Sequence, residues 1–245
     1  MYELFSKKNY IEFIVISDLH LCNKLDRIDL LYKAYEYADK NKLKYVINLG
    51  DLFDSYMPHN KNDLKIKTLS KQVEYVIDNY PYSDTIKTLV LYGNHDYYSK
   101  LYYHKDIVKW LSDARSDLIN LGYGENYINI KDNYVKLQHE IDYLKNYKKN
   151  LETYITLLGH YHNYKVSIND NNIYVYAPSL SDLKMNNINS SILHIRIDFN
   201  NEMFSNINIK CVDIEKNIIT SEFDTNINMK VKKHQFIKEK IKENL

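Results

Sequence analysis

The 245-residue sequence predicts an α/β (α+β) fold, because its first half alternates two kinds of apolar pattern. Short, nearly continuous apolar runs at 11–16, 45–49 and 88–92 are typical of strands buried on both faces, as in a parallel sheet. Between them, 26–39 and 63–80 carry apolar residues at a helical period, and Pro81 ends the second helix. Strands and helices therefore alternate.

The second half predicts mostly β structure with Asn-rich turns. The expected elements are a short helix at 106–111, strands at 126–130, 134–138, 155–158, 166–168, 173–176, 191–199 and 206–212, and a helical, lysine-rich segment at 143–152. No repeat or linker divides the chain, so we expect one domain over 1–220. A basic tail, 221–245, follows and is expected to be helical, either as a solvated helix or as an arm for nucleic acid or a partner.

Composition excludes several classes of protein. The formal net charge is +1, which gives no overall bias toward polyanions or membranes. No apolar run approaches the roughly 18 residues needed to span a bilayer. Two cysteines do not form a disulfide framework, and the first ten residues lack the apolar core of a secretory signal. We expect a cytoplasmic protein without a membrane partner.

Most of the candidate metal ligands fall in five short segments. They are Asp18-Leu19-His20, Gly50-Asp51-Leu52-Phe53-Asp54, Gly93-Asn94-His95-Asp96, His139, and Gly159-His160-Tyr161-His162. Several directly follow an expected strand, where open α/β sheets place their sites. The pairs two residues apart would point the same way in an extended segment, so each could converge on one cluster. Such oxygen and nitrogen donors suit hard or borderline divalent metals.

In their order and spacing, these segments resemble the calcineurin-like metallophosphoesterase superfamily, whose pattern is D-x-H, G-D-x-x-D, G-N-H-D/E, H and G-H-x-H. The resemblance covers roughly residues 10–180. It implies a four-layer αββα sandwich, with two mixed β-sheets packed face to face and helices outside. It also implies two divalent metal ions, with manganese expected and iron or zinc as alternatives.

The same resemblance assigns a role to each site residue. Asp18, His20, Asp51 and His162 would hold the first metal, and Asn94, His139 and His160 the second, with Asp51 bridging. His95 would protonate the leaving oxygen and would be oriented by Asp96. Asp54 would not bind a metal itself but would contact a ligand histidine and hold it in its tautomer. One departure from the pattern is Glu140, directly after His139.

The function expected from these features is hydrolysis of a phosphodiester by a hydroxide held between the two metals, with His95 as general acid. A small nuclease acting on DNA or RNA and a phosphoprotein phosphatase are alternatives within the same chemistry. A non-catalytic metal-binding scaffold is the alternative from another class. The tyrosines that follow the third segment (Tyr97, Tyr98, Tyr102, Tyr103) could stack on a base or an aromatic ester, or could serve only loop packing.

Overall fold

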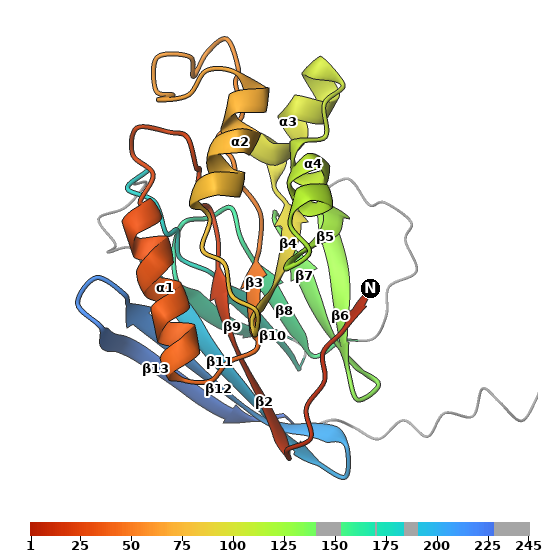
Figure 1. The fold of residues 1–245 in the computed structure, drawn as a ribbon. Helices are drawn as coiled ribbons and strands as arrows, with labels where there is room; N and C mark the ends of the chain where they lie inside the picture. The colour runs from red at the N-terminus through yellow and green to blue at the C-terminus, as the bar shows by residue number, and fades with distance from the viewer. Residues whose placement is uncertain (141–152, 170, 184–190, 228–245) are drawn as a thin grey trace, which may run out of the picture.

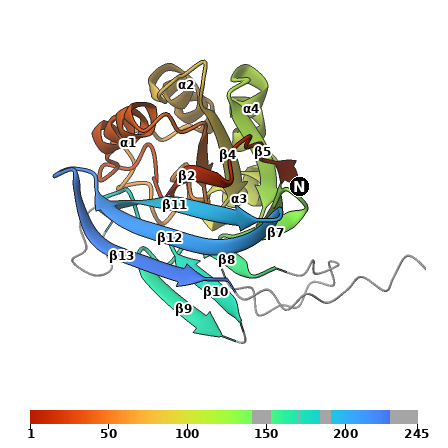
Figure 2. The same ribbon diagram turned by 90° about the horizontal axis from the view of Figure 1, so that it is seen from below.

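The computed structural model describes residues 1–140, 153–169, 171–183 and 191–227, drawn as a ribbon in Figure 1. Its core is two mixed β-sheets packed face to face with flanking helices, as the resemblance of the five segments implies (Figure 2). The seven-stranded sheet has the order β13 (Ile218–Asn226), β12 (Met203–Asp213), β11 (Ser191–Asn200), β2 (Tyr10–Ile16), β3 (Tyr45–Asn48), β4 (Lys87–Tyr92), β5 (Leu118–Tyr123). The six-stranded sheet has the order β1 (Tyr2–Glu3), β6 (Glu125–Ile130), β7 (Asn133–Gln138), β8 (Ile155–Leu158), β10 (Asn172–Tyr176), β9 (Lys165–Asn169).

Strand β2 shows why the predicted strands are continuously apolar. It pairs in parallel with β3 and antiparallel with β11, so it lies inside the sheet. Its Ile14 and Ile16 pack in a cluster with helix residues, whereas Phe13 and Val15 pack in the core between the two sheets. Both faces are therefore buried, and an alternating polar position would have no contact with water.

The helices described are α1 (Ile28–Lys40), α2 (Leu69–Asn79), α3 (Asn94–Tyr103) and α4 (Ile107–Ala114). Helices α1, α2 and α4 pack on the seven-stranded sheet through one apolar cluster that includes Leu31, Val76 and Leu111. Figure 2 shows these three helices together on one side of that sheet. Among the residues that the structure describes, no helix combines the length and apolar character needed to cross a bilayer.

Two differences from the predicted elements have physical causes. Helix α2 starts at Leu69, because 63–68 forms an irregular segment tied down by a bridge between Asn23 and Leu64. Helix α3 was not predicted, since its buried side chains are polar (Asp96 and Ser99) and give no apolar period. Strands β1, β5 and β13 were also missed.

The C-terminal boundary also differs from expectation. Strand β13 pairs with β12 and runs to Asn226, so the sheet continues past the expected domain end at residue 220. The helix expected in the tail beyond residue 227 and the helical segment expected at 143–152 lie outside the described residues.

Candidate metal centre and active site

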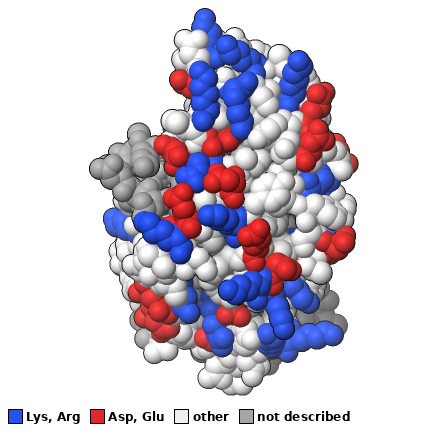
Figure 3. Space-filling view, turned by 60° about the vertical axis from the view of Figure 1, so that its left-hand side comes forward, with Lys and Arg blue, Asp and Glu red and all other residues white. Residues whose placement is uncertain are grey.

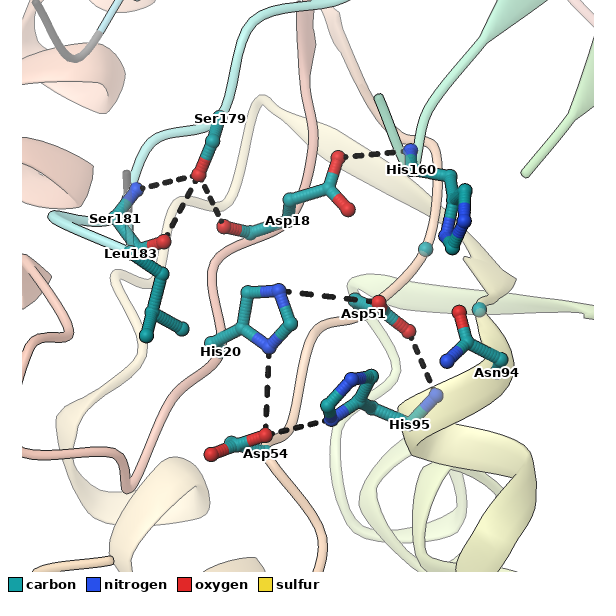
Figure 4. Close-up of polar contacts among 12 residues, drawn as sticks. Asp18, His20, Asp51, Asp54, Asn94, His95, His160, Ser179, Ser181 and Leu183 are labelled. Atoms are coloured by element: carbon teal, nitrogen blue, oxygen red, sulfur yellow. Dashed lines mark hydrogen bonds and ion pairs between the residues drawn. The ribbon is translucent and has the colours of Figure 1, made fainter. Parts of the chain in front are cut away.

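The five segments meet at one end of the two sheets. The first, second and fifth segments follow the carboxyl ends of β2, β3 and β8. The third segment forms the start of α3, and the fourth, His139, directly follows β7. These strands end at the same edge of the two-sheet core, so residues far apart in the chain converge on the arrangement in Figure 4.

The ligand pairs converge through left-handed turns, and the extended conformation expected for them is wrong. The φ angles are 54° at Asp18, 44° at His20, 51° at Asp51, 70° at His160 and 52° at His162. Left-handed backbone at non-glycine residues costs of order 1–3 kcal/mol each and tends to gather at functional sites. Five such residues among the seven candidate ligands therefore indicate a site built at a cost in stability.

Two glycines allow the loops to approach each other. A Cβ at Gly93 would collide with the side chain and the backbone nitrogen of Asp51. A Cβ at Gly50, where φ is +111°, would collide with Nδ1 of His139 and lie 2.7 Å from the nitrogen of Gly93. Glycine is required at both positions because the loop carrying Asp51 packs directly on the start of α3.

The first group of candidate ligands consists of Asp18, His20, Asp51 and His162. Nε2 of His162 lies 3.3 Å from Oδ1 of Asp18 and 3.4 Å from Nε2 of His20. Nε2 of His20 lies 3.8 Å from Oδ2 of Asp51. The donor atoms therefore surround one small space.

The second group shares Asp51 with the first. Nε2 of His139 lies 3.2 Å from Oδ2 of Asp51 and 3.1 Å from Oδ1 of Asn94. The His160 ring packs edge-on against that of His139, with centroids 5.1 Å apart. Because the same carboxylate oxygen faces His20 and His139, Asp51 stands between the groups, where a bridging ligand would be.

These donors fit divalent cations. Oδ1 of Asp18 is fully buried and makes no well-formed hydrogen bond among the described residues, although Nε2 of His162 lies 3.3 Å away; a cation bound there would satisfy it. The opposite ring nitrogens are fixed: Nδ1 of His139 donates to the carbonyl of Leu49 at 2.8 Å, and Nδ1 of His162 to that of Leu183 at 2.9 Å. Each Nε2 therefore keeps a lone pair for a metal.

The charges in the centre also favour cations. Burial opposes ionisation of Asp51, but His139 and the other imidazoles outweigh it and hold the pKa of the carboxyl well below its usual range. Burial would lower the pKa of His139, but Asp51 and Asp18 raise it to about 10. The buried carboxylates thus attract positive charge, and a metal would displace protons from the imidazoles.

His95 lies beside this centre, and its orientation corrects one expectation. Its Nδ1 lies 2.6 Å from Oδ1 of Asp54, and its backbone N–H donates to Oδ1 of Asp51 at 2.8 Å (Figure 4). The carboxylate that orients the ring is therefore Asp54. Asp96 does not have that role, because its oxygens accept hydrogen bonds from the backbone N–H groups of Leu52, Phe53 and Gly93.

Asp54 has a wider role than expected. Its Oδ1 also lies 3.4 Å from Nδ1 of His20, and its Oδ2 accepts a hydrogen bond from Asn23 at 2.6 Å. Burial would lower the pKa of His95, but the bond with Asp54 and the charge of Asp51 raise it to about 9. The imidazole thus keeps a proton on Nε2 while Nδ1 is held by Asp54.

A cleft of about 490 Å³ opens over His20, Asp51, His95, His160 and His162. Its outer wall includes Leu25, His59, Asp63 and Leu183, and none of its described lining residues is a lysine or arginine. None of the four tyrosines after the third segment lines it, and Tyr97 instead stacks on Tyr123 with ring centroids 4.0 Å apart. The structure therefore favours packing over ligand stacking for these rings.

Sequence reasoning missed several residues that support the site. Ser179 donates to the backbone oxygen of Asp18 at 2.9 Å, and the Ser17 hydroxyl donates to the side chain of Asp18. The hydroxyl of Tyr98 accepts a hydrogen bond from Nδ2 of Asn94 at 3.3 Å, and Oε2 of Glu140 lies 3.7 Å from Nε2 of His160. Two of them had a sequence signal: Tyr98, as one of the tyrosines following the third segment, and Glu140, as the departure from the pattern after His139.

A family model described as calcineurin-like phosphoesterase matches residues 11–212, which contain all five segments. The chain belongs to this family. Comparison with curated protein sequences gives no match. Three solved structures show the same fold.

Yfce, a phosphoesterase from E. coli, matches with a TM-score of 0.56 and 14% identity, over 89% of this chain and 100% of that one. GAP50, the anchor in the inner membrane complex of Plasmodium, has a TM-score of 0.54 and 12% identity, over 90% of each chain. Vacuolar Protein Sorting 29 from Cryptosporidium parvum has a TM-score of 0.52 and 11% identity, over 89% and 98%. At such identities the likeness concerns the fold alone, so activity must be argued from the site.

Proposed function

We propose that this calcineurin-like phosphoesterase is a metal-dependent phosphodiesterase. The observation that carries the proposal is the position of Asp51. One carboxylate faces the imidazoles of both ligand groups, and its other oxygen anchors the backbone of His95. A non-catalytic scaffold would have no need for a complete ligand set at strained positions beside an oriented histidine.

The proposed centre holds two divalent cations. Asp18, His20, Asp51 and His162 would hold one, and Asp51, Asn94, His139 and His160 the other. Carboxylate, amide and imidazole donors without a thiolate suit manganese, iron or zinc; of these, the family resemblance favours manganese. Such cations supply neutralisation of phosphate charge and an activated water.

The chain's own groups supply the proton. With Nδ1 of His95 bonded to Asp54, Nε2 is the ring nitrogen left to face a substrate in the cleft. Its proton would pass to the leaving alkoxide or aryloxide oxygen as the ester bond breaks, and proton donation of this kind contributes about 10²–10⁴-fold to rate. Asp54 would stabilise the protonated ring before transfer.

The lining of the cleft supports a diester over a monoester. A phosphodiester carries one negative charge at neutral pH, whereas a monoester carries nearly two and is usually also bound by arginine or lysine. Here the described lining residues include neither. The same feature gives no specific support to a nuclease, because nucleic-acid sites depend on cationic contacts to phosphates.

The test is hydrolysis of bis(p-nitrophenyl) phosphate by chelator-treated protein before and after manganese is restored. We expect manganese to restore activity, and His95→Asn to lose about 10²–10⁴-fold of it. His104→Asn is the matched control, because His104 is exposed and has a left-handed φ of 54° that asparagine tolerates. Manganese-independent hydrolysis, or a fully active His95→Asn variant, would refute the proposal.

A further inference from the structure

A second cavity, of about 330 Å³, lies at the other end of the seven-stranded sheet from the catalytic cleft. It is formed by residues 5–8, the first residues of β2 and β3, and the turn 41–44 that follows α1. The catalytic segments follow the carboxyl ends of β2 and β3, whereas this cavity lies at their amino ends. The two cavities share no lining residue.

The inner surface of this cavity is apolar and aromatic. Ile11 and Leu43 line it and are only 3% and 5% exposed, so they form a dry floor. Tyr10 and Tyr45 add half-buried rings. Phe5 is 68% exposed, and its backbone N–H donates to the Tyr45 hydroxyl at 3.1 Å, which holds the segment at the rim. A flat ring entering the cavity would cover the exposed ring of Phe5 and the exposed parts of the two tyrosine rings.

The rim of the cavity is positively charged. Nζ of Lys8 lies 2.7 Å from the Tyr10 hydroxyl, and the other lysines that line the cavity are Lys7, Lys42 and Lys44. These three make no ion pair with a carboxylate among the described residues. Figure 3 shows Lys and Arg side chains at the lower end of the molecule, where β2 begins, with several Asp and Glu side chains among them and another group of Lys and Arg at the upper end.

Among the described residues that line the cavity, the one carboxylate, that of Glu12, does not neutralise these lysines. Oε1 of Glu12 lies 3.7 Å from Nε2 of His194 and 3.9 Å from the Arg196 guanidinium, and it is thus turned toward β11. The described lining of the cavity thus has four lysines and one carboxylate that is already paired, whereas the whole chain has a net charge of only +1. The local potential therefore favours an anion.

We propose that this cavity binds a small organic phosphate that carries a flat ring, such as a mononucleotide. The ring would lie on the floor of Ile11 and Leu43 against Phe5, and the phosphate would face Lys42 and Lys44. An apolar, aromatic interior with a few convergent charged groups is the usual form of a small-molecule site. The volume suits one ring and one phosphate, whereas a nucleic-acid strand would need an extended groove.

The test is a calorimetric titration of the full-length protein with adenosine 5′-monophosphate in the presence of a chelator. Inorganic phosphate and adenosine form separate arms, since each supplies only one of the two expected contacts. We expect saturable binding of the nucleotide, and binding at least about tenfold weaker for either fragment alone.

Two double variants locate the site. Lys42→Glu with Lys44→Glu should weaken nucleotide binding by about tenfold or more, because two phosphate contacts become repulsive. Lys67→Glu with Lys71→Glu makes the same charge change at exposed positions outside this cavity and should leave binding unchanged. Phe5→Ala should also weaken nucleotide binding. An unchanged affinity would mean that the ring of the nucleotide does not lie against Phe5.

Two results would overturn the inference. One is the absence of saturable nucleotide binding. The other is nucleotide affinity that changes equally in the two charge-reversed double variants. Equal weakening would mean that the nucleotide binds by net charge alone, and no weakening in either would mean that it binds elsewhere. Since no turnover is measured and metal is removed, the outcome is independent of the proposed phosphodiesterase activity.

Discussion

Asp54 and His95 are joined by a short polar contact at the centre of the site, with 2.6 Å from Oδ1 to Nδ1. The same oxygen lies 3.4 Å from Nδ1 of His20. One buried carboxylate thus orients both the candidate proton donor and a candidate metal ligand. Substitution of Asp54 should therefore affect chemistry more than folding.

Asp54→Asn is expected to lower kcat on a diester by about 10–100-fold, because partners behind a ligand or catalytic histidine fix its tautomer and orientation. Asp96→Asn should instead lower the free energy of unfolding by about 1–3 kcal/mol, because an amide cannot accept all three backbone hydrogen bonds. Steady-state kinetics and urea unfolding of both variants separate these effects. If Asp96→Asn were stable but inactive and Asp54→Asn were fully active, the carboxylate that orients His95 would be Asp96.

Tyr98→Phe is expected to weaken binding of one metal ion by several-fold, up to about tenfold. The hydroxyl of Tyr98 accepts from Nδ2 of Asn94, so its loss lets the amide turn and present nitrogen, which cannot bind a metal, in place of Oδ1. The measurement is calorimetric titration of metal-free protein with manganese. Tyr102→Phe is the control, since Tyr102 is 56% exposed and lies on the same helix. Identical affinities in the two variants would contradict this role for Tyr98.

Arg115→Ala should lower the free energy of unfolding by about 3–5 kcal/mol. The guanidinium is 11% exposed, pairs with Asp117 at 2.7 Å, and donates to the backbone oxygens of Tyr80 and Pro81 after the end of α2. Its removal leaves a buried carboxylate and two carbonyls without a partner. Thermal and urea unfolding measure the loss. Lys109→Ala, which breaks an exposed pair with Asp113, should leave the unfolding midpoint unchanged; an equal loss in both variants would mean that burial does not matter here.

The sequence predicted the strands that are buried on both faces and the segments that follow them, because burial and ligand chemistry restrict residue type directly. Residues 11–16 and 88–92 are examples, each within one residue of the observed strand. Helix α3 could not be predicted in this way, since it is fixed by hydrogen bonds to Asp96 and not by an apolar face.

Within the candidate site, residue types were predictable and geometry was not. The expected extended pairs are left-handed turns, because the loops must bend back over the strand ends to bring Asp18 and His160 together, where the N–H of His160 donates to Oδ2 of Asp18. That Asp54, and not Asp96, reaches the ring of His95 has the same origin. Both follow a motif glycine in sequence, and only the packing of Gly93 on Asp51 decides which carboxylate reaches the imidazole.

The central claim is that Asp51 joins two cation sites, and the most direct test is anomalous diffraction from crystals soaked in manganese. Two peaks about 3.5–4 Å apart, one beside His20 and one beside His139 with Asp51 between them, are the predicted result. A single peak, or manganese bound away from Asp51, would contradict it.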